Sequence, residues 1–178
     1  MASVIPERIS ELQIVHYPAP ELRRFADPVT QFDGRLSALA QRMVELMFEF
    51  KGIGLAAPQV GVLLRMFVSN HTGEPDDTRI FVNPELDVSG ELVGREEGCL
   101  SMPQVYGEVV RPAHVVISAQ DLQGKQFSLT DDELAARVWQ HETNHLDGQL
   151  IIDRFSMSTK LSVRKLLAEF ESKSAARQ

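Results

Sequence analysis

Hydrophobic residues recur three and four positions apart in three separate stretches of the chain. This spacing predicts an amphipathic helix over residues 36–47, a second helix from residue 130 to about residue 147, and a third helix from residue 156 onward. Several segments between the first two helices are instead rich in β-branched and aromatic residues. The chain therefore combines helices with a group of strands.

The strand-like segments lie at residues 64–68, 79–82 and 102–106, and two more are separated by a turn near Gln123-Gly124. The last two, residues 115–117 and 127–129, predict a hairpin. Because neighbouring strands are joined by short turns, we expect a mostly antiparallel sheet in an α+β fold. The sheet should wrap around a buried central helix, with the third helix at the C-terminus, and residues 1–178 should form one domain.

The start of the second helix has a candidate capping sequence. Thr130 and Glu133 have the spacing of a capping box, and the acidic residues between them suit the positive end of a helix dipole. Gly148 offers a stop at the other end. We therefore expect the helix to begin at Thr130.

The second helix carries the pattern His-Glu-x-x-His. Residues four apart share one face of a helix, so His141 and His145 can bind one metal ion while Glu142 lies beside them. The competing interpretation is a buried helix whose two histidines are only hydrogen-bonded. Two histidines that continue an apolar stripe are costly to bury without partners, which favours the metal site.

A hydrolytic metal site of this kind needs a third protein ligand. The metzincin arrangement fails, because Ile151 stands where its third histidine would be. Glu169 and Glu171 are available for a gluzincin arrangement, but they fall in a charged terminal segment. Cys99 is the only cysteine of the chain, and a Cys/His/His set leaves the fourth tetrahedral position open to water. Taken alone, a single cysteine is more often a small buried side chain.

A third candidate segment is the run of small residues from Gly52 to Gln59. Its glycines allow a ligand to approach the backbone closely, and the Gln59 amide could donate a hydrogen bond to an oxyanion. A phosphate-binding loop is the alternative, but no Lys-Ser/Thr pair follows and no strand precedes it. An ordinary connection between a helix and a strand is also compatible with this segment alone.

Taken together, residues 52–59, 97–101 and 141–145 resemble the three motifs of the peptide deformylases. The resemblance extends to residues 14–29 near the N-terminus and to residues 103–112 after the cysteine motif. It implies a metallohydrolase that removes the formyl group from the N-terminal formyl-methionine of newly made polypeptides and releases formate.

The resemblance also implies roles for individual residues. Cys99, His141 and His145 would bind one divalent metal ion per chain, and Glu142 would act as general base and then as general acid. The Gln59 amide and the backbone N–H of Leu100 would stabilise the oxyanion. The ion implied for the cell is Fe²⁺, while the donor set also suits Zn²⁺, Ni²⁺ or Co²⁺.

Further residues are expected around this centre. We expect Glu97 to pair with Arg111 and to brace the Cys99 loop. The implied methionine pocket would use Ile53, Leu134 and Val138, which could equally be core residues, and the peptide backbone would pair near Gly54 and the strand from Met102 to Tyr106.

Two positions depart from the family pattern. Asn144 stands where many deformylases have Asp, and it should face away from the two histidines by helical phase. Tyr106 stands where some members have an Arg that touches the substrate backbone. Neither departure removes a catalytic group.

Composition and charge disfavour several classes of protein. The chain has 178 residues, of which 43% are hydrophobic and 24% charged, and its net charge of −7 disfavours general or sequence-specific binding of nucleic acid. A lone cysteine indicates a reducing compartment. Residues 1–11 lack the apolar core of a secretory signal, and no segment is long and apolar enough to span a membrane. We expect a bacterial cytoplasmic protein, with a processed organellar form as the alternative.

The C-terminal segment is locally basic. Its apolar residues are flanked by positive charges, which fits a helix packed on the domain with a solvated basic face. The resemblance implies a second interpretation, which is docking at the ribosome. The apolar positions are Leu161, Val163, Leu166, Leu167 and Phe170, and the basic ones are Lys160, Arg164, Lys165, Lys173 and Arg177.

Two other classes of function compete with this interpretation. One is a different HExxH metallopeptidase, which is distinguished by whether Cys99 is a ligand. The other is a catalytically silent interaction module with a structural metal, but such sites are closed by four protein ligands and the sequence offers no fourth.

Overall fold

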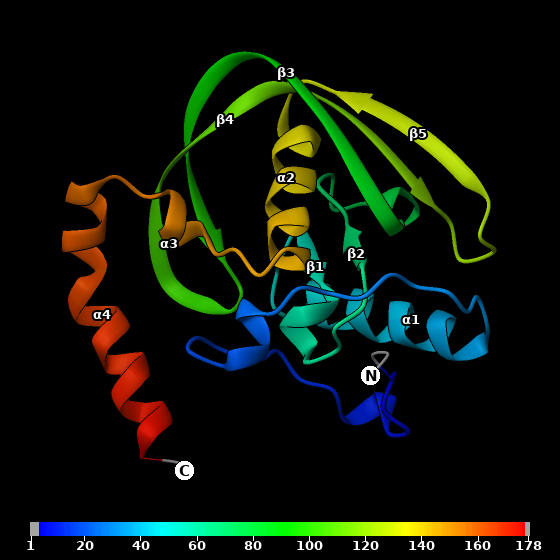
Figure 1. The fold of residues 1–178 in the computed structure, drawn as a ribbon, viewed down its shortest axis with the longest axis horizontal. Coiled ribbons are helices and arrows are strands. Elements are labelled where there is room, and N and C mark those ends of the chain that lie inside the picture. The colour runs from blue at the N-terminus through cyan, green and yellow to red at the C-terminus, as the bar shows by residue number, and fades with distance from the viewer. Residues whose placement is uncertain (1–3, 177–178) are drawn as a thin grey trace.

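The computed structural model describes residues 4–176 and has one antiparallel sheet with four α-helices around it (Figure 1). The five strands are hydrogen-bonded in chain order, β1-β2-β3-β4-β5. The predicted α+β fold with a mostly antiparallel sheet is therefore confirmed. The strands are β1 (Gly54–Ala56), β2 (Met66–Ser69), β3 (Arg79–Cys99), β4 (Met102–Gln120) and β5 (Gln126–Asp131), and the helices are α1 (Gly34–Glu49), α2 (Leu134–Leu146), α3 (Ile151–Arg154) and α4 (Met157–Ala175).

The long hairpin of β3 and β4 gives the sheet its shape. It curves around α2, which lies at the centre of the molecule (Figure 1). The pairing shifts register between Ser89 and Leu92 and again between Gly98 and Cys99. Such irregularities bend a strand, so the hairpin can follow the helix instead of continuing as a flat sheet. The last of the register shifts lies at Cys99, which is the final residue of β3.

Helix α1 covers the other end of the sheet. The Asp33 side chain caps it by accepting hydrogen bonds from the backbone N–H groups of Arg35 and Leu36. The helix ends at Glu49, and Lys51 then has a left-handed backbone with φ of 56°. This sharp exit turns the chain directly into the Gly52–Gly54 segment and β1. The apolar face predicted between residues 36 and 47 is buried.

The prediction that α2 begins at Thr130 is wrong. Thr130 is a residue of β5 and pairs with Val116 of β4, and the helix begins at Leu134. The side chain of Asp131 accepts hydrogen bonds from the N–H groups of Glu133 and Ala136 instead. Sheet pairing has therefore moved the helix start by about one turn, and a neighbouring carboxylate does the capping.

Helix α4 runs along the outer side of β4 at one edge of the molecule (Figure 1). Val163 is buried there, and Leu166, Leu167 and Phe170 pack against the same cluster. Leu161 is 62% exposed, so its predicted place in the apolar stripe is wrong. The predicted basic residue Arg177 lies outside the described residues. None of the described helices combines the length and apolar character needed to cross a membrane.

Candidate metal centre and active site

A cavity of about 860 Å³ opens beside α2, between the Gly52–Gly54 segment and the end of the β3–β4 hairpin. The structure brings most of the predicted site residues together on its walls. His145 and Arg111 are not among the lining residues. Those that do line it are Ile53, Gly54, Gln59, Glu97, Cys99, Leu100, Tyr106, Leu134, Val138, His141 and Glu142.

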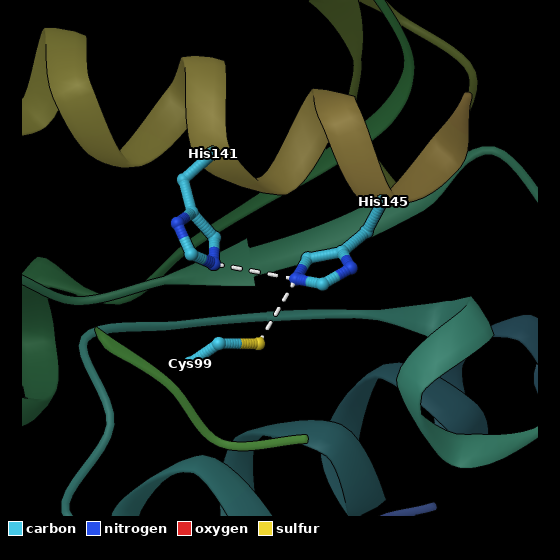
Figure 2. Close-up of side chains that lie close together, drawn as sticks. All are labelled: Cys99, His141 and His145. Carbon is cyan, nitrogen blue, oxygen red and sulfur yellow. Dashed lines mark hydrogen bonds between the residues drawn. The ribbon is translucent and has the colours of Figure 1, made fainter. Parts of the chain in front are cut away.

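Three predicted metal ligands converge at the inner end of this cavity. His141 and His145 extend from the same side of α2 toward the Cys99 sulfur (Figure 2). His145 Nε2 is 3.2 Å from His141 Nε2 and 3.3 Å from Cys99 Sγ. All three donor atoms lie within 4.8 Å of one another. Helix periodicity aligns the two histidines, and the bend at the end of β3 supplies the thiol.

These separations fit one metal ion. Tetrahedral bonds of about 2.0 Å to nitrogen and about 2.3 Å to sulfur place neighbouring donor atoms roughly 3.3–3.6 Å apart. Two imidazole nitrogens and one thiol form a donor set that binds divalent transition metals. Burial lowers the pKa of His145 well below its usual value, which keeps the ring neutral and able to bind a metal.

Glu142 lies next to this group and is also buried. Its Oε2 atom has no hydrogen-bond partner among the described residues, although the cavity reaches this side chain. Burial raises the pKa of the carboxyl to about 7. A buried carboxyl with this pKa and a free oxygen can accept a proton at neutral pH and give it back.

Gln59 is held in one orientation by its neighbours. It lies in the short 3-10 helix η3 (Ala57–Val60), and its Oε1 accepts a hydrogen bond of 2.8 Å from Ala56 N. The opposite amide nitrogen is therefore directed into the site, 3.2 Å from Ser101 Oγ and 3.5 Å from Cys99 Sγ. An N–H donor thus lies next to the predicted thiol ligand, and it could donate to an oxyanion there.

The predicted pair of Glu97 and Arg111 is present and belongs to a larger charged cluster. Arg111 donates two hydrogen bonds to the Glu97 carboxylate, at 2.7 and 2.8 Å, and Glu97 Oε2 lies 3.1 Å from His141 Nδ1. Burial alone would raise the pKa of Glu97, but the contacts with Arg111 and His141 hold it well below its usual value. The carboxylate therefore fixes the ring of one predicted ligand.

Arg137 is a member of this cluster that the sequence analysis missed. It donates to Glu97 Oε1 at 2.7 Å and to the backbone oxygens of Val109 and Val93. It thus connects α2 to both strands of the curved hairpin. The available signal was its place four residues before His141, on the same helical face.

Asn144 faces away from the metal group, as expected from helical phase. Its Oδ1 accepts hydrogen bonds from Arg111 Nη1 at 2.8 Å and from Arg154 Nε at 3.0 Å. A neutral amide thus stands between two cations. The contact joins the charged cluster to α3.

The residues predicted to contact substrate differ in exposure. Ile53 is 43% and Leu134 39% exposed at the cavity, whereas Val138 is buried. The ring of Tyr106 lies against Gly98, where a Cβ atom would be only 2.5 Å from Tyr106 Cε1. Sequence reasoning did not identify Phe50, which also lines the cavity and is partly exposed.

The alternative third ligands do not join the group. Glu169 lines a separate hollow beside α4, and Glu171 accepts a hydrogen bond from the Tyr17 hydroxyl. Across residues 4–176, the donor atoms that converge are those of Cys99, His141 and His145. The structure therefore gives no support to a gluzincin arrangement.

Comparison with known proteins agrees with this geometry. The sequence model of the family described as polypeptide deformylase matches residues 11–161. A peptide deformylase of Rhodopirellula baltica is 40% identical, with 94% of this chain and 84% of that protein covered. The chloroplastic/mitochondrial peptide deformylase 1B of Arabidopsis thaliana is 42% identical over 91% of this chain and 60% of its own length.

Solved structures give the same result. The crystal structure of a plant peptide deformylase (PDF1B) is 41% identical and superposes with a TM-score of 0.91, over 94% of this chain and 93% of that one. The peptide deformylase of Plasmodium falciparum is 39% identical, with a TM-score of 0.89 over 92% and 98% of the two chains. The chain therefore belongs to the polypeptide deformylase family, the metal-dependent hydrolases that remove the N-formyl group from newly made polypeptides.

Proposed function

We propose that Cys99, His141 and His145 hold one divalent metal ion and that Glu142 performs the proton transfers of deformylation. The observation that carries this assignment is the convergence of three donor atoms beside a buried carboxyl oxygen that has no partner among the described residues. When bound, the ion would supply Lewis acidity, which lowers the pKa of water and polarises a carbonyl oxygen.

The other steps of the reaction are carried out by side chains and backbone groups of this chain. Glu142 takes a proton from the attacking water, and the water oxygen forms a bond to the formyl carbon. The Gln59 Nε2 and the backbone N–H of Leu100 donate hydrogen bonds to the formyl oxygen as it becomes negative. Glu142 then gives its proton to the amine nitrogen as the C–N bond breaks, which leaves formate and a free N-terminal methionine.

The test is formate release from formyl-methionyl-alanine by protein purified without oxygen and loaded with Fe²⁺ or Ni²⁺. We expect Glu142→Ala to lose roughly 10²- to 10⁴-fold in kcat/KM while it keeps its metal, because general acid and base catalysis is worth about that much. Glu108→Ala, at an exposed glutamate of β4, is the matched control and should keep full activity. Undiminished formate release by Glu142→Ala would contradict the assignment.

We infer that the methionine side chain enters the cavity beside α2, in contact with Ile53, Leu134 and Val138. The exposure of the first two at the cavity supports this placement. The peptide backbone would pair with β1 at Gly54, because β1 is hydrogen-bonded in the sheet only to β2 and Gly54 lines the cavity. Tyr106 would lie beside the backbone after methionine.

We propose Fe²⁺ as the metal in the cell, supported by the family resemblance. Both ferrous iron and the Cys99 thiolate are open to oxidation. The Fe²⁺-loaded protein should therefore lose activity in air within the time in which a Ni²⁺-loaded sample keeps it. If both samples lose activity equally in air, the oxygen sensitivity lies in the thiolate, and the result gives no support for iron.

We propose that α4 also contributes a basic surface for docking at the ribosome. Lys160, Arg164 and Lys165 are exposed along it. Cosedimentation with ribosomes should decrease for a chain that ends at Ser158 and for Arg164→Glu combined with Lys165→Glu. Equal binding by the full chain and both variants would refute this surface. The compartment would be the one in which formylated chains are made, the bacterial cytoplasm or an organelle.

A further inference from the structure

A second hollow, of about 200 Å³, lies between the start of β4 and the inner side of α4. The β4 wall is formed by Pro103 and Gln104. The α4 wall is formed by Leu166, Glu169, Phe170 and Lys173. Leu166 and Phe170 are only partly buried, so apolar surface borders this hollow.

The hollow adjoins the active-site cavity along one ridge. Pro103 and Gln104 line both the hollow and the active-site cavity, and these two residues form the ridge between them. Gln104 holds a left-handed backbone with φ of 66°, a conformation that side-chain-bearing residues rarely adopt. The ridge is therefore a defined turn of the chain between two concave surfaces.

Several contacts hold the α4 wall in place. Val163 and Leu167 pack into the cluster below α4, and the Tyr17 hydroxyl donates a hydrogen bond of 2.6 Å to Glu171. Phe155 and Thr159 lie directly over Gly107 of β4. The hollow is thus bordered by a helix anchored at both ends.

We propose that this hollow is a distal subsite that receives an apolar side chain of the formylated polypeptide after it has crossed the Pro103–Gln104 ridge. The inference rests on the proposed function of the neighbouring cavity. A volume of about 200 Å³ lies below the roughly 300–1,000 Å³ of a small-molecule site, and so suits one side chain. Glu169 and Lys173 contribute one charge of each sign, which gives the rim no preference for a charged residue.

The geometry of β4 gives the approximate position of that side chain. Met102 pairs with Cys99, and Gln104 is two residues further along β4. Paired strands lie about 5 Å apart and a strand advances about 3.3 Å per residue at right angles to that spacing, so the ridge is roughly 8 Å from Cys99. An extended chain covers this distance in about two or three residues. The subsite should therefore receive the side chain of about the third or fourth residue.

The α4 wall also lies outside the segment that the family model matches. That match ends at residue 161, whereas the wall begins at Leu166. The subsite is therefore inferred from this chain's own helix and not from the features that define the family.

The test compares kcat/KM for formyl-methionyl peptides of six residues. Leucine or serine is placed at each of positions three to six in turn, with alanine elsewhere. In the unchanged protein, leucine at position three or four should raise kcat/KM roughly threefold to tenfold over serine, because the apolar side chain is partly removed from water. Phe170→Ser should abolish this gain and leave formyl-methionyl-alanine hydrolysis unchanged.

Two further variants test whether the gain from leucine depends on the hollow itself. Phe170→Trp should fill the hollow and also reduce the gain, without removing apolar packing from α4. Leu161→Ser changes an exposed position of the same helix and should keep the gain from leucine. No gain from leucine at any position, a gain that survives both Phe170 variants, or an equal loss in Leu161→Ser would overturn the subsite. Failure of the proposed function would be seen separately, as a metal-loaded protein that does not hydrolyse formyl-methionyl-alanine.

Discussion

Gly54 and Glu142 are so close that neither position has room for additional atoms. A Cβ atom built on Gly54 would collide with Glu142 Oε1 and would lie 2.8 Å from its Cδ. Both residues are buried, so the carboxyl cannot simply turn into solvent. The absence of a side chain at Gly54 is therefore what allows the proposed acid and base to lie beside the edge strand.

Gly54→Ala should displace the Glu142 carboxyl and block the edge of β1. We expect kcat/KM for formyl-methionyl-alanine to fall at least about tenfold, since small displacements of a catalytic group have large effects. Metal content should stay unchanged, because the three atoms nearest to the new Cβ all belong to Glu142 and none to the proposed ligands Cys99, His141 and His145. Activity within about a factor of two of the unchanged protein would contradict this account.

For single residues, the sequence predicted those features of the site that follow from helix periodicity. The direction of His141 and His145 follows from their spacing, and the motif order identified Cys99. Helical phase could place Arg137 on the face of His141, but its pairing with Glu97 could not be predicted, because Glu97 is 40 residues away and reaches it only after the hairpin has curved around α2. The Gln59 amide is oriented locally by Ala56 N, but the contact of its nitrogen with Ser101 is nonlocal and could not be predicted either.

Helix α4 is attached to the domain through a very close approach to β4. A Cβ atom at Gly107 would lie 2.5 Å from Thr159 Cγ2 and 2.7 Å from Phe155 Cζ. The helix can therefore pack this tightly only because β4 has no side chain at that point. The resulting orientation of α4 buries Val163 and leaves Leu161 exposed.

Gly107→Ala should weaken the packing of α4 without touching the metal group. Overpacking of this kind costs about 1–3 kcal/mol, so the free energy of unfolding should decrease by that amount in urea titrations. Gly34→Ala is the matched control, because a Cβ atom there meets nothing within 4 Å. Equal stabilities of the two variants would show that α4 adjusts freely to the added methyl group.

The sequence predicted the elements better than their ends. The apolar periodicity of α1 and α4 identified both helices, and turn residues identified the β4–β5 hairpin. The start of α2 was wrong because the pairing of Thr130 with Val116 overrides a favourable local capping sequence. The exposure of Leu161 follows from helical phase, because at about 100° per residue it lies roughly 180–200° around α4 from Val163 and Phe170, and the predicted stripe overlooked this.

For the molecule as a whole, Glu97 is the carboxylate through which α2, β3 and β4 are joined. It lies on β3 and pairs with Arg111 of β4 and with Arg137 and His141 of α2. Its folded pKa is lowered from the ordinary value of 4.5. The unfolded chain therefore binds a proton at a higher pH than the folded protein does.

The sign of the resulting pH dependence follows from this difference. The contribution of Glu97 to stability is fully present above about pH 4.5 and is lost as the pH falls toward the folded pKa. Between about pH 4.5 and about pH 3, the free energy of unfolding of the metal-free protein should fall by up to about 1.4 kcal/mol per pH unit from this group.

Urea titrations at several pH values measure this slope. Glu97→Gln should be less stable at neutral pH and should have a shallower decrease in the acid range. Glu108→Gln removes an exposed carboxylate from the same hairpin and should retain the original slope. A Glu97→Gln slope equal to that of the unchanged protein would show that the acid sensitivity arises elsewhere.

The distance along the chain between the thiol and the last histidine has a consequence for biosynthesis. Cys99 and His145 are 46 residues apart in sequence, and β4 must pair with β3 and curve with it around α2 before their donor atoms meet. Two of the three proposed ligands thus belong to a helix that leaves the ribosome well after the thiol. The complete set of proposed ligands is consequently available only after α2 has left the ribosome, and a nascent copy of this enzyme cannot act until α2 has been made and enclosed by its own hairpin.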